Sequence, residues 1–441
     1  MKKVFFSNLF CMSVGSWILL MALLPAAVVS AQTLTIDSCQ SKAFANYPLV
    51  KQYGIIEIAR KYTIDNINKG YFPQLTLGVK ASYQSDVTQI PSSLGNAISQ
   101  LTHQPFTFPS LSKDQYQAML DANQLIWDGG VLSAQKKIAN QNAEVEHEKL
   151  TVDLYGFRDQ VNRLFFGTLL FNEQLKQTQI LINDLQTNYD KLLAYKDNGL
   201  LHQADLDVLR VEQLNAEQHK ADLINSRNTF LILLSAVTGM KIDENTILKK
   251  PTIDLNQLSD TTNHRPELNL FDAQNKMYQR EIGLQVAGTM PRLSLFGQAG
   301  YGKPGLNMFT NAFSDFYLGG VKLAWNISSL YSLKNNIIKL ELNRKSVDIQ
   351  KETFLFNNNI VSKQQRNEIL NLQQSILNDD EIIGLRHNIK TATEAKVQNG
   401  AANVNDLIRD VNAENQARQN KSLHEIQLLT DIYQLKNTVN N

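Results

Sequence analysis

The sequence predicts an α+β membrane protein in which short β-barrel strands, four per chain, continue into a long α-helical coiled-coil barrel. Three observations support this fold class: the chain is duplicated, each half has short segments of alternating apolar and polar residues, and each half has a long stretch without proline. The duplication is clearest in the prolines, because Pro48 and Pro73 recur as Pro266 and Pro291 with the same spacing of 25 residues. A repeat of this period is too long for a solenoid unit, so we expect a duplicated half-protein.

The first 31 residues have the composition of a secretory signal peptide. Lys2 and Lys3 supply positive charge, an apolar run extends over 17–29, and small residues follow at 29–31. Such a segment is removed on export, and its apolar run is too short to span a bilayer. The alternative interpretation is an uncleaved N-terminal anchor.

The composition of the chain excludes several classes of function. The chain has 43 basic and 42 acidic residues, and this balance argues against nucleic acid or an anionic surface as the main partner. After export only Cys39 remains, so no internal disulfide is expected. No segment after the signal has 18 uninterrupted apolar residues, which predicts no transmembrane helix. The seven histidines are dispersed and no catalytic constellation is visible, so we expect no enzyme activity, no cofactor and no metal site.

The predicted strands are recognised by their alternation. In the segment 74–83, every second residue from Leu75 to Tyr83 is apolar, and the residues between them are polar or small. The second half repeats this pattern over 293–301, and 317–325 supplies a partner strand with the same alternation. An apolar outer face and a polar inner face are typical of outer-membrane barrel strands. The alternative is a strand half-buried in a soluble sandwich.

The strand that pairs with 74–83 has a less regular pattern. Around 115–127 the apolar parity changes, and a bulge near Asn123 and Gln124 would reconcile the two parts. The loop between these two strands is 20 residues longer than its counterpart in the second half, and we expect it to be a surface excursion. Four strands leave two edges that lipid does not tolerate, so if these strands lie in a membrane, the barrel must be shared between chains. Three copies would supply twelve strands.

Two stretches predict very long helices. Neither 130–198 nor 332–399 contains a proline, and apolar residues recur in steps of three and four, which is coiled-coil spacing. As a single α-helix, each stretch would be about 100 Å long. Each stretch ends at Asn-Gly, and a glycine after the last turn stops a helix. A return helix follows in each half, over 203–236 and 405–439, so we expect two antiparallel hairpins of matched length.

Each hairpin tip carries an aspartate six residues after its glycine. These aspartates are Asp205 after Gly199 and Asp406 after Gly400. Two interpretations are open. Either the carboxylates favour the N-terminal end of the return helix, or their copies in an oligomer form acidic rings at a constriction.

In this combination the features resemble the outer-membrane efflux protein family, to which the TolC channel belongs. The resemblance covers the whole mature chain and is carried by the paired prolines, the strand ends at Trp127 and Trp325, and the Asn-Gly-x5-Asp-Leu tips. It implies a homotrimer with a TolC-like 12-stranded β-barrel in the outer membrane of a Gram-negative bacterium and a helical tunnel in the periplasm. It also implies contact with outer-membrane lipid, a periplasmic adaptor, and an inner-membrane transporter of the RND, ABC or MFS type, with no nucleic acid. The implied role is a passive exit duct in tripartite efflux or type I secretion.

The resemblance also assigns roles to residues of the tips. It implies that Asp406 belongs to an acidic ring at the periplasmic gate, that Arg409 and Asp410 lie where a second ring would be, and that Asp205 takes part in links between hairpins. The adaptor is expected to contact both tips. These contact residues are Asn198, Gly199, Leu200 and Leu201 in the first tip and Asn399, Gly400, Ala401 and Ala402 in the second.

The predicted division of the chain follows the repeat. It comprises a signal peptide (1–31), a first structural repeat (32–240), a connecting equatorial segment (241–262) and a second structural repeat (263–441). A hypothesis of a different class is a soluble periplasmic coiled-coil scaffold with a small β-domain. The exported substrate does not follow from this sequence, because the transporter and adaptor would select it.

Overall fold

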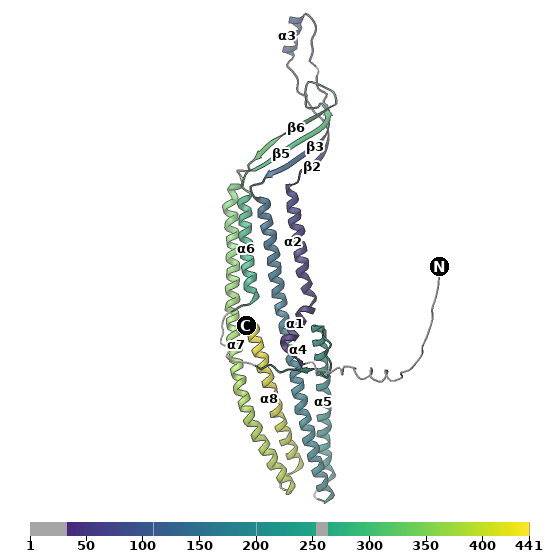
Figure 1. Ribbon diagram of the computed structural model, residues 1–441, viewed down its shortest axis with the longest axis vertical. Coiled ribbons are helices and arrows are strands. Elements are labelled where there is room, and N and C mark those ends of the chain that lie inside the picture. The colour runs from purple at the N-terminus through teal and green to yellow at the C-terminus, as the bar shows by residue number, and fades with distance from the viewer. Residues whose placement is uncertain (1–32, 109, 200, 253–262, 441) are drawn as a thin grey trace, which may run out of the picture.

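The structure is a computed structural model that describes residues 33–108, 110–199, 201–252 and 263–440. The predicted signal peptide, Leu200 of the first tip and 253–262 of the connecting segment lie outside the described residues. Figure 1 shows an elongated molecule with a small sheet towards one end and long helices running away from it. We call the end that carries the short helix α3 (Ser92–Thr102) the outer end and the opposite end the tip end.

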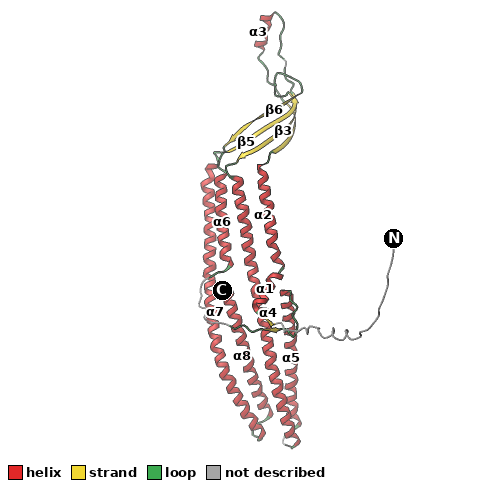
Figure 2. Cartoon of the chain, in the orientation of Figure 1, coloured by secondary structure: helices red, strands yellow, loops and turns green. Residues whose placement is uncertain are grey.

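The elements follow one another in the predicted order of helix, two strands and long helical hairpin, once in each half (Figure 2). The first half contains β1 (Thr33–Leu34), α1 (Ile36–Asn46), a 3-10 turn (Pro48–Lys51), α2 (Gln52–Asn68), a second 3-10 turn (Lys69–Tyr71), β2 (Gln74–Tyr83), α3, β3 (Asp114–Trp127), α4 (Val131–Asp197) and α5 (Gln203–Thr238). The second half contains β4 (Ile247–Leu248), α6 (Pro266–Ala287), β5 (Arg292–Lys303), β6 (Ser314–Ala324), α7 (Ser329–Gln398) and α8 (Val404–Val439).

The main sheet has four antiparallel strands in the order β2-β3-β5-β6. Its register places apolar residues opposite one another, as in the pairs Leu77 with Leu120 and Leu295 with Val321. Because side chains alternate along a strand, these pairs share one face of the sheet. β2 and β6 are the two edges, so the sheet is an open arc in a single chain.

The predicted bulge in β3 lies at a different residue. Pairing is regular through Asn123 and Gln124, and the register shifts between Leu125 and Trp127. The expectation of a bulge at 123–124 is therefore wrong by about two residues. The extra residue is Ile126, and both Ile126 and Trp127 are exposed, because a bulge turns two neighbouring side chains towards the same side.

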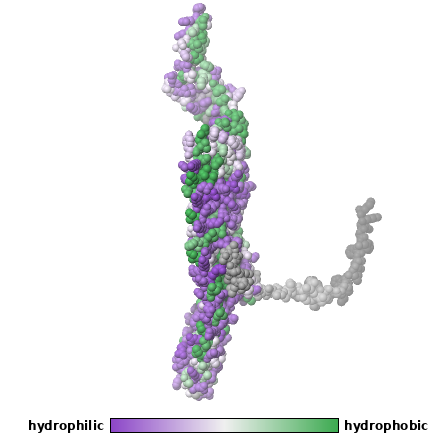
Figure 3. Space-filling view, turned by 90° about the vertical axis from the view of Figure 1, so that its left-hand side faces the viewer, coloured by the Kyte–Doolittle hydropathy of each residue, from purple (hydrophilic) through white to green (hydrophobic). Residues whose placement is uncertain are grey.

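The two faces of the sheet differ in polarity. One face exposes large apolar side chains, and Figure 3 shows apolar surface gathered over this part of the molecule. These side chains include Leu75, Leu77, Val79, Tyr83, Leu120, Leu295, Tyr301, Tyr317, Val321 and Leu323. On the other face Gln298 donates a hydrogen bond to Asp121 at 2.7 Å. The alternation predicted for these strands is confirmed, and the apolar side chains of this face are exposed in the single chain.

The long helices form a layer, and near the sheet its outermost helices lie on the same sides of the chain as the edge strands β2 and β6. Near the sheet, neighbouring helices contact one another in the order α2-α4-α6-α7, and near the tips in the order α5-α4-α8-α7. α4 has 67 residues and α7 has 70, and each runs from the sheet to a tip as one continuous helix. In the described ranges no helix has a stretch long and apolar enough to cross a membrane.

Each return helix ends beside the start of its repeat, just before Pro48 for α5 and just before Pro266 for α8. We call these two places the joints. In the first half, Asn46 donates from Nδ2 to the carbonyl oxygens of Ala236 and Val237, at 3.3 and 3.2 Å, at the end of α5. In the second half, Arg265 donates from Nη1 to the carbonyl oxygen of Asn437, at 3.0 Å, at the end of α8. Both joints therefore supply donors to the carbonyls that a helix C-terminus leaves unpaired.

The core of the molecule lies at the same level as these joints. It contains Phe165 and Phe166 of α4 with Cys39 of α1 and Leu234 of α5. Burial raises the pKa of the Cys39 thiol to about 12, so this thiol stays protonated and unreactive. The residues after α5 join this region, because β4 pairs in parallel with β1 and Lys249 donates to the carbonyl of Leu34.

Candidate functional site

The two hairpin tips are built in the same way. Asn198 and Asn399 each fold the side chain back, and Nδ2 donates at 2.8 Å to the carbonyl oxygen four residues earlier. Gly199 and Gly400 follow with φ of 76° and 67°, a left-handed conformation that favours glycine. The Asn-Gly signal therefore has a physical cause at both tips: the asparagine caps a helix carbonyl and the glycine reverses the chain.

One apolar cluster joins the two hairpins just behind their tips. It draws on α4, α5, α7 and α8, so the tips are packed together within one chain. Its buried members are Leu185, Leu192, Leu206, Leu209, Ala216, Val397, Val404, Leu407, Ile408 and Val411. Leu201 and Ala402, both expected to contact an adaptor, pack partly against this cluster. The other described tip residues, at 198–199 and 399–401, are exposed.

The two tip aspartates have different surroundings. Asp205 accepts a hydrogen bond from the backbone N–H of His202 at 3.0 Å, so it caps the start of α5. Asp406 instead lies 3.2 Å from the guanidinium of Arg409, and the side chain of Asn403 caps α8 in its place. The capping interpretation thus accounts for Asp205, while Asp406 keeps a partly exposed carboxylate beside a cation.

Arg409 and Asp410 are separated by burial although they are neighbours in sequence. Arg409 is 69% exposed, and it contacts both Asp406 and Asp410. Asp410 is buried and accepts a hydrogen bond from the hydroxyl of Thr393 on α7 at 2.7 Å. Its carboxylate therefore fastens α8 to α7 and is not presented at the surface of the tip.

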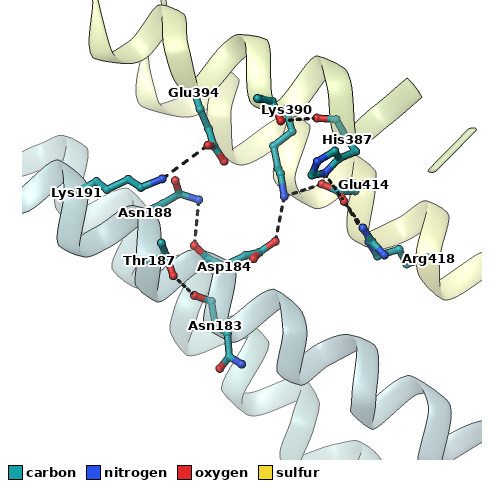
Figure 4. Close-up of polar contacts among 11 residues, drawn as sticks. Asn183, Asp184, Thr187, Asn188, Lys191, His387, Lys390, Glu394, Glu414 and Arg418 are labelled. Carbon is teal, nitrogen blue, oxygen red and sulfur yellow. Dashed lines mark hydrogen bonds and ion pairs between the residues drawn. The ribbon is translucent and has the colours of Figure 1, made fainter. Parts of the chain in front are cut away.

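A buried ion cluster links the first hairpin to the second, and sequence reasoning missed it. Lys390 of α7 lies 2.7 Å from Glu414 of α8 and 3.1 Å from Asp184 of α4 (Figure 4). The side chains of Lys390 and Glu414 are only 9% and 4% exposed. We call Asp184, Lys390 and Glu414 the tether, because one lysine bridges carboxylates from both hairpins.

Neighbouring groups complete the surroundings of the tether. Arg418 lies 2.6 Å and His387 lies 3.3 Å from Oε1 of Glu414. A weaker pair between Lys191 and Glu394, at 3.8 Å, crosses the same boundary between α4 and α7 (Figure 4). The Glu-to-Arg spacing of four residues within α8 was a visible signal of a local pair. Nothing in the sequence indicated its partners on the other two helices.

The pKa values of the tether follow from burial and pairing. Burial raises the pKa of the Glu414 carboxyl, but hydrogen bonds and positive charges from Lys390 and Arg418 outweigh it, and the net pKa lies below its ordinary 4.5. Burial lowers the pKa of the Lys390 amine, but hydrogen bonds to Glu414 and Asp184 outweigh it, and the net pKa lies above its ordinary 10.5. Both groups are therefore charged at neutral pH.

These directions predict a dependence of stability on pH. The contribution of Glu414 is present above 4.5 and is lost as pH falls through its lower folded pKa, whereas that of Lys390 is lost only as pH rises through a value above 10.5. We expect the thermal unfolding midpoint to fall in acid more steeply for the native chain than for Glu414→Gln. Equal slopes for the two proteins would show that Glu414 does not carry the acid sensitivity.

The structure also places an apolar seam along one side of α7. Leu342, Ile349, Phe356, Leu370 and Leu377 are all exposed and are separated by seven residues or a multiple of seven. This is the repeat by which helices pair in coiled coils. The opposite edge of the helical layer exposes Ile55, Ile58 and Tyr62 on α2 and Val211 and Leu214 on α5.

Among the described residues, no three His, Cys, Asp or Glu side chains come together in a way that could hold a metal ion. The polar groups at the tips instead pair with one another across helices. The contacts between the two hairpins can hold them together or release them. The open edges of the helical layer are available to further copies of the chain.

Comparison with known proteins identifies the fold. No family model and no curated protein matches the chain. The solved structure of CusC, described as a transmembrane channel, is similar with a TM-score of 0.64 and 14% identity, over 92% of this chain and 91% of that chain. The outer membrane protein VceC of Vibrio cholerae has a TM-score of 0.62 and 12% identity, over 91% of this chain and 94% of its own. The MtrE outer membrane channel of Neisseria gonorrhoeae has a TM-score of 0.59 and 14% identity, over 91% and 88%.

These likenesses, at low identity, establish the fold. The chain has the TolC-like fold of outer-membrane channels over nearly its whole described length. The resemblance in fold that the sequence predicted is confirmed.

Proposed function

We propose that the protein is a passive exit duct in the outer membrane of a Gram-negative bacterium and that it extends into the periplasm. Three copies would close into a tube of twelve strands and twelve long helical segments. An inner-membrane transporter of the RND, ABC or MFS type would supply the energy, and a periplasmic adaptor would contact the tips. The chain itself would carry out no chemical reaction.

The observation that carries this proposal is the agreement between the edges of the sheet and those of the helical layer. β2 and α2 lie at one side of the arc, and β6 and α7 lie at the other. Each side presents unpaired strand backbone next to exposed apolar helix residues, and such edges are normally covered. In a ring of copies related by one rotation, each copy would cover the open edge of its neighbour in both the sheet and the helical layer. The exposed apolar face of the sheet would then contact lipid, which a soluble scaffold would not provide.

We propose Asp406, with Arg409, as the gate residues and the tether as the link that holds the hairpins. Support for Asp406 comes from its partly exposed carboxylate on α8 and its pairing with Arg409. Asp205 is proposed to support the first hairpin through its cap. We leave Asp410 out of the gate, since its carboxylate is buried against α7. The described tip residues 198–199, 201 and 399–402 remain the proposed adaptor contacts, and Leu200 lies outside the described residues.

The proposed function is tested by reconstitution into planar lipid bilayers. We expect the purified protein to conduct ions, and Asp406→Ala to raise its resting conductance, because the substitution removes the partly exposed one of the two carboxylates that contact Arg409 at the tip. Asn405→Ala, an exposed neighbour, is the matched control and should leave conductance unchanged. A protein of trimer mass that never conducts would contradict the duct. Equal conductance for the native protein and Asp406→Ala would remove Asp406 from the gate.

A further inference from the structure

The helix α3 forms a small, self-packed unit at the outer end, well beyond the sheet (Figure 1). The backbone N–H of Phe106 donates to the hydroxyl of Ser99 at 2.8 Å, and the rings of Phe106 and Phe108 meet edge to face at 5.0 Å. A side chain at Gly95 would lie 3.3 Å from the carbonyl oxygen of Phe106, so the returning segment passes close to the helix there. The unit is therefore ordered by its own contacts.

One side of α3 is apolar and uncovered. Leu94, Ala97 and Leu101 are separated by three and four residues, so they form a stripe along the helix, and all three are exposed. Leu101 is 83% exposed, which is the highest exposure of any leucine among the described residues. We call these three residues the crown stripe. An apolar stripe on a self-packed unit indicates a partner surface.

The charge of this region limits what the partner can be. No Asp, Glu, Lys or Arg occurs between Val87 and Ser112, nor between Pro304 and Phe313 in the neighbouring loop, although 19% of the whole chain is charged. An anionic lipid surface attracts Lys and Arg, and the region supplies neither. In a rotationally symmetric oligomer, residues that lie close to the axis meet their own copies, and like charges at such a position would repel one another. An uncharged apolar stripe is suited to that position.

We propose that the crown stripe binds the crown stripes of the other copies of this chain, so that three α3 helices meet over the outer mouth of the tube. This inference rests on the proposed trimer. The repeat supports it, because only the first half carries the long loop with α3, and each chain therefore contributes one helix. Three helices around one axis form a closed contact, whereas six would crowd it. The duct would then have an apolar closure at its outer end, separate from the tips.

The proposal is tested by disulfide cross-linking of the assembled protein. Leu101→Cys in a Cys39→Ser background, oxidised with copper phenanthroline, is expected to give covalently linked pairs of chains, because stripe residues of two copies would lie within disulfide reach. Asn96→Cys, exposed on the opposite side of α3, is the matched control and should give at least about tenfold fewer links. Equal linking of the two variants in a protein of intact trimer mass would overturn the crown contact and leave the duct standing. A monomer mass would overturn both.

A second measurement separates a contact between copies from insertion into lipid. A bimane fluorophore on Leu101→Cys, in vesicles of phosphatidylcholine with or without spin-labelled lipid, is expected to keep its emission. Strong quenching by the spin-labelled lipid would place the stripe in the bilayer and overturn the proposal. Asn96→Cys with the same label serves as the reference for an exposed position.

Discussion

We expect the double substitution Ile349→Asp and Phe356→Asp to abolish the trimer while leaving each chain folded. Both side chains belong to the seam on α7, and they are 62% and 65% exposed in the single chain. Their replacement therefore removes little that the chain uses for its own core. Multi-angle light scattering in detergent should report one chain per particle in place of three.

The size of the effect follows from what a closed ring would bury at this seam. Full burial of an aliphatic or aromatic side chain is worth roughly 1.5–3 kcal/mol, so two such residues in each of three interfaces would contribute on the order of 10 kcal/mol. Aspartate forfeits this contribution and adds the cost of burying unpaired charge. The association is then expected to fail at micromolar concentrations, where the native chain forms the trimer.

Gln350→Asp is the matched control for the seam. It introduces the same carboxylate one residue along α7, a quarter turn away from the seam, at a position that is also exposed. This variant should remain trimeric. If the double variant keeps the trimer mass, the seam is not the interface, and the proposed arrangement of copies is wrong. If Gln350→Asp also dissociates, charge on α7 is the cause and not the loss of the apolar seam.

Periodicity predicted the regular elements of this fold well. β2 begins and ends at the predicted residues Gln74 and Tyr83, because a strict alternation of apolar and polar side chains has only one strand register. The long helices α4 and α7 end within two residues of the predicted stops, because Asn-Gly supplies both a cap and a left-handed turn. Such signals lie within a few neighbouring residues, so they can be read from the sequence of a single chain.

The features that prediction missed depend on how distant elements pair. The three residues of the tether, Asp184, Lys390 and Glu414, come from three helices, and their meeting depends on helix registers that no spacing specifies. The bulge at Ile126 depends on the register of β3 against β5. The helix α3 was expected only as a loop, since its capping signals are weak and it lies between proline-rich segments.

Loss of the lysine from the tether is the second large effect that we expect. Lys390→Met keeps a straight side chain of similar length and removes the cation between Asp184 and Glu414. Breaking a buried ion pair on one side costs about 3–5 kcal/mol, because the remaining charge stays buried without its partner. Here Arg418 still contacts Glu414, and the side chain of Asp184 is 42% exposed and remains partly solvated, so we expect a smaller loss of about 2–3 kcal/mol. Thermal unfolding in detergent measures the loss.

Two further variants decide whether the tether, and not charge in general, holds the hairpins. Lys191→Met removes the ion pair between Lys191 and Glu394, whose side chains are 44% and 22% exposed, respectively. An ion pair with this exposure contributes about 0–1 kcal/mol to stability. Lys390→Met combined with Glu414→Gln removes both buried charges and should regain most of the stability, since no buried carboxylate is left unpaired. In bilayers, however, Lys390→Met and the double variant should both conduct more than the native protein, because in both variants α4 is no longer linked to α7 by the bridging lysine. If conductance returns to the native level together with stability, the lysine bridge does not restrain the hairpins, and the apolar cluster behind the tips holds them instead.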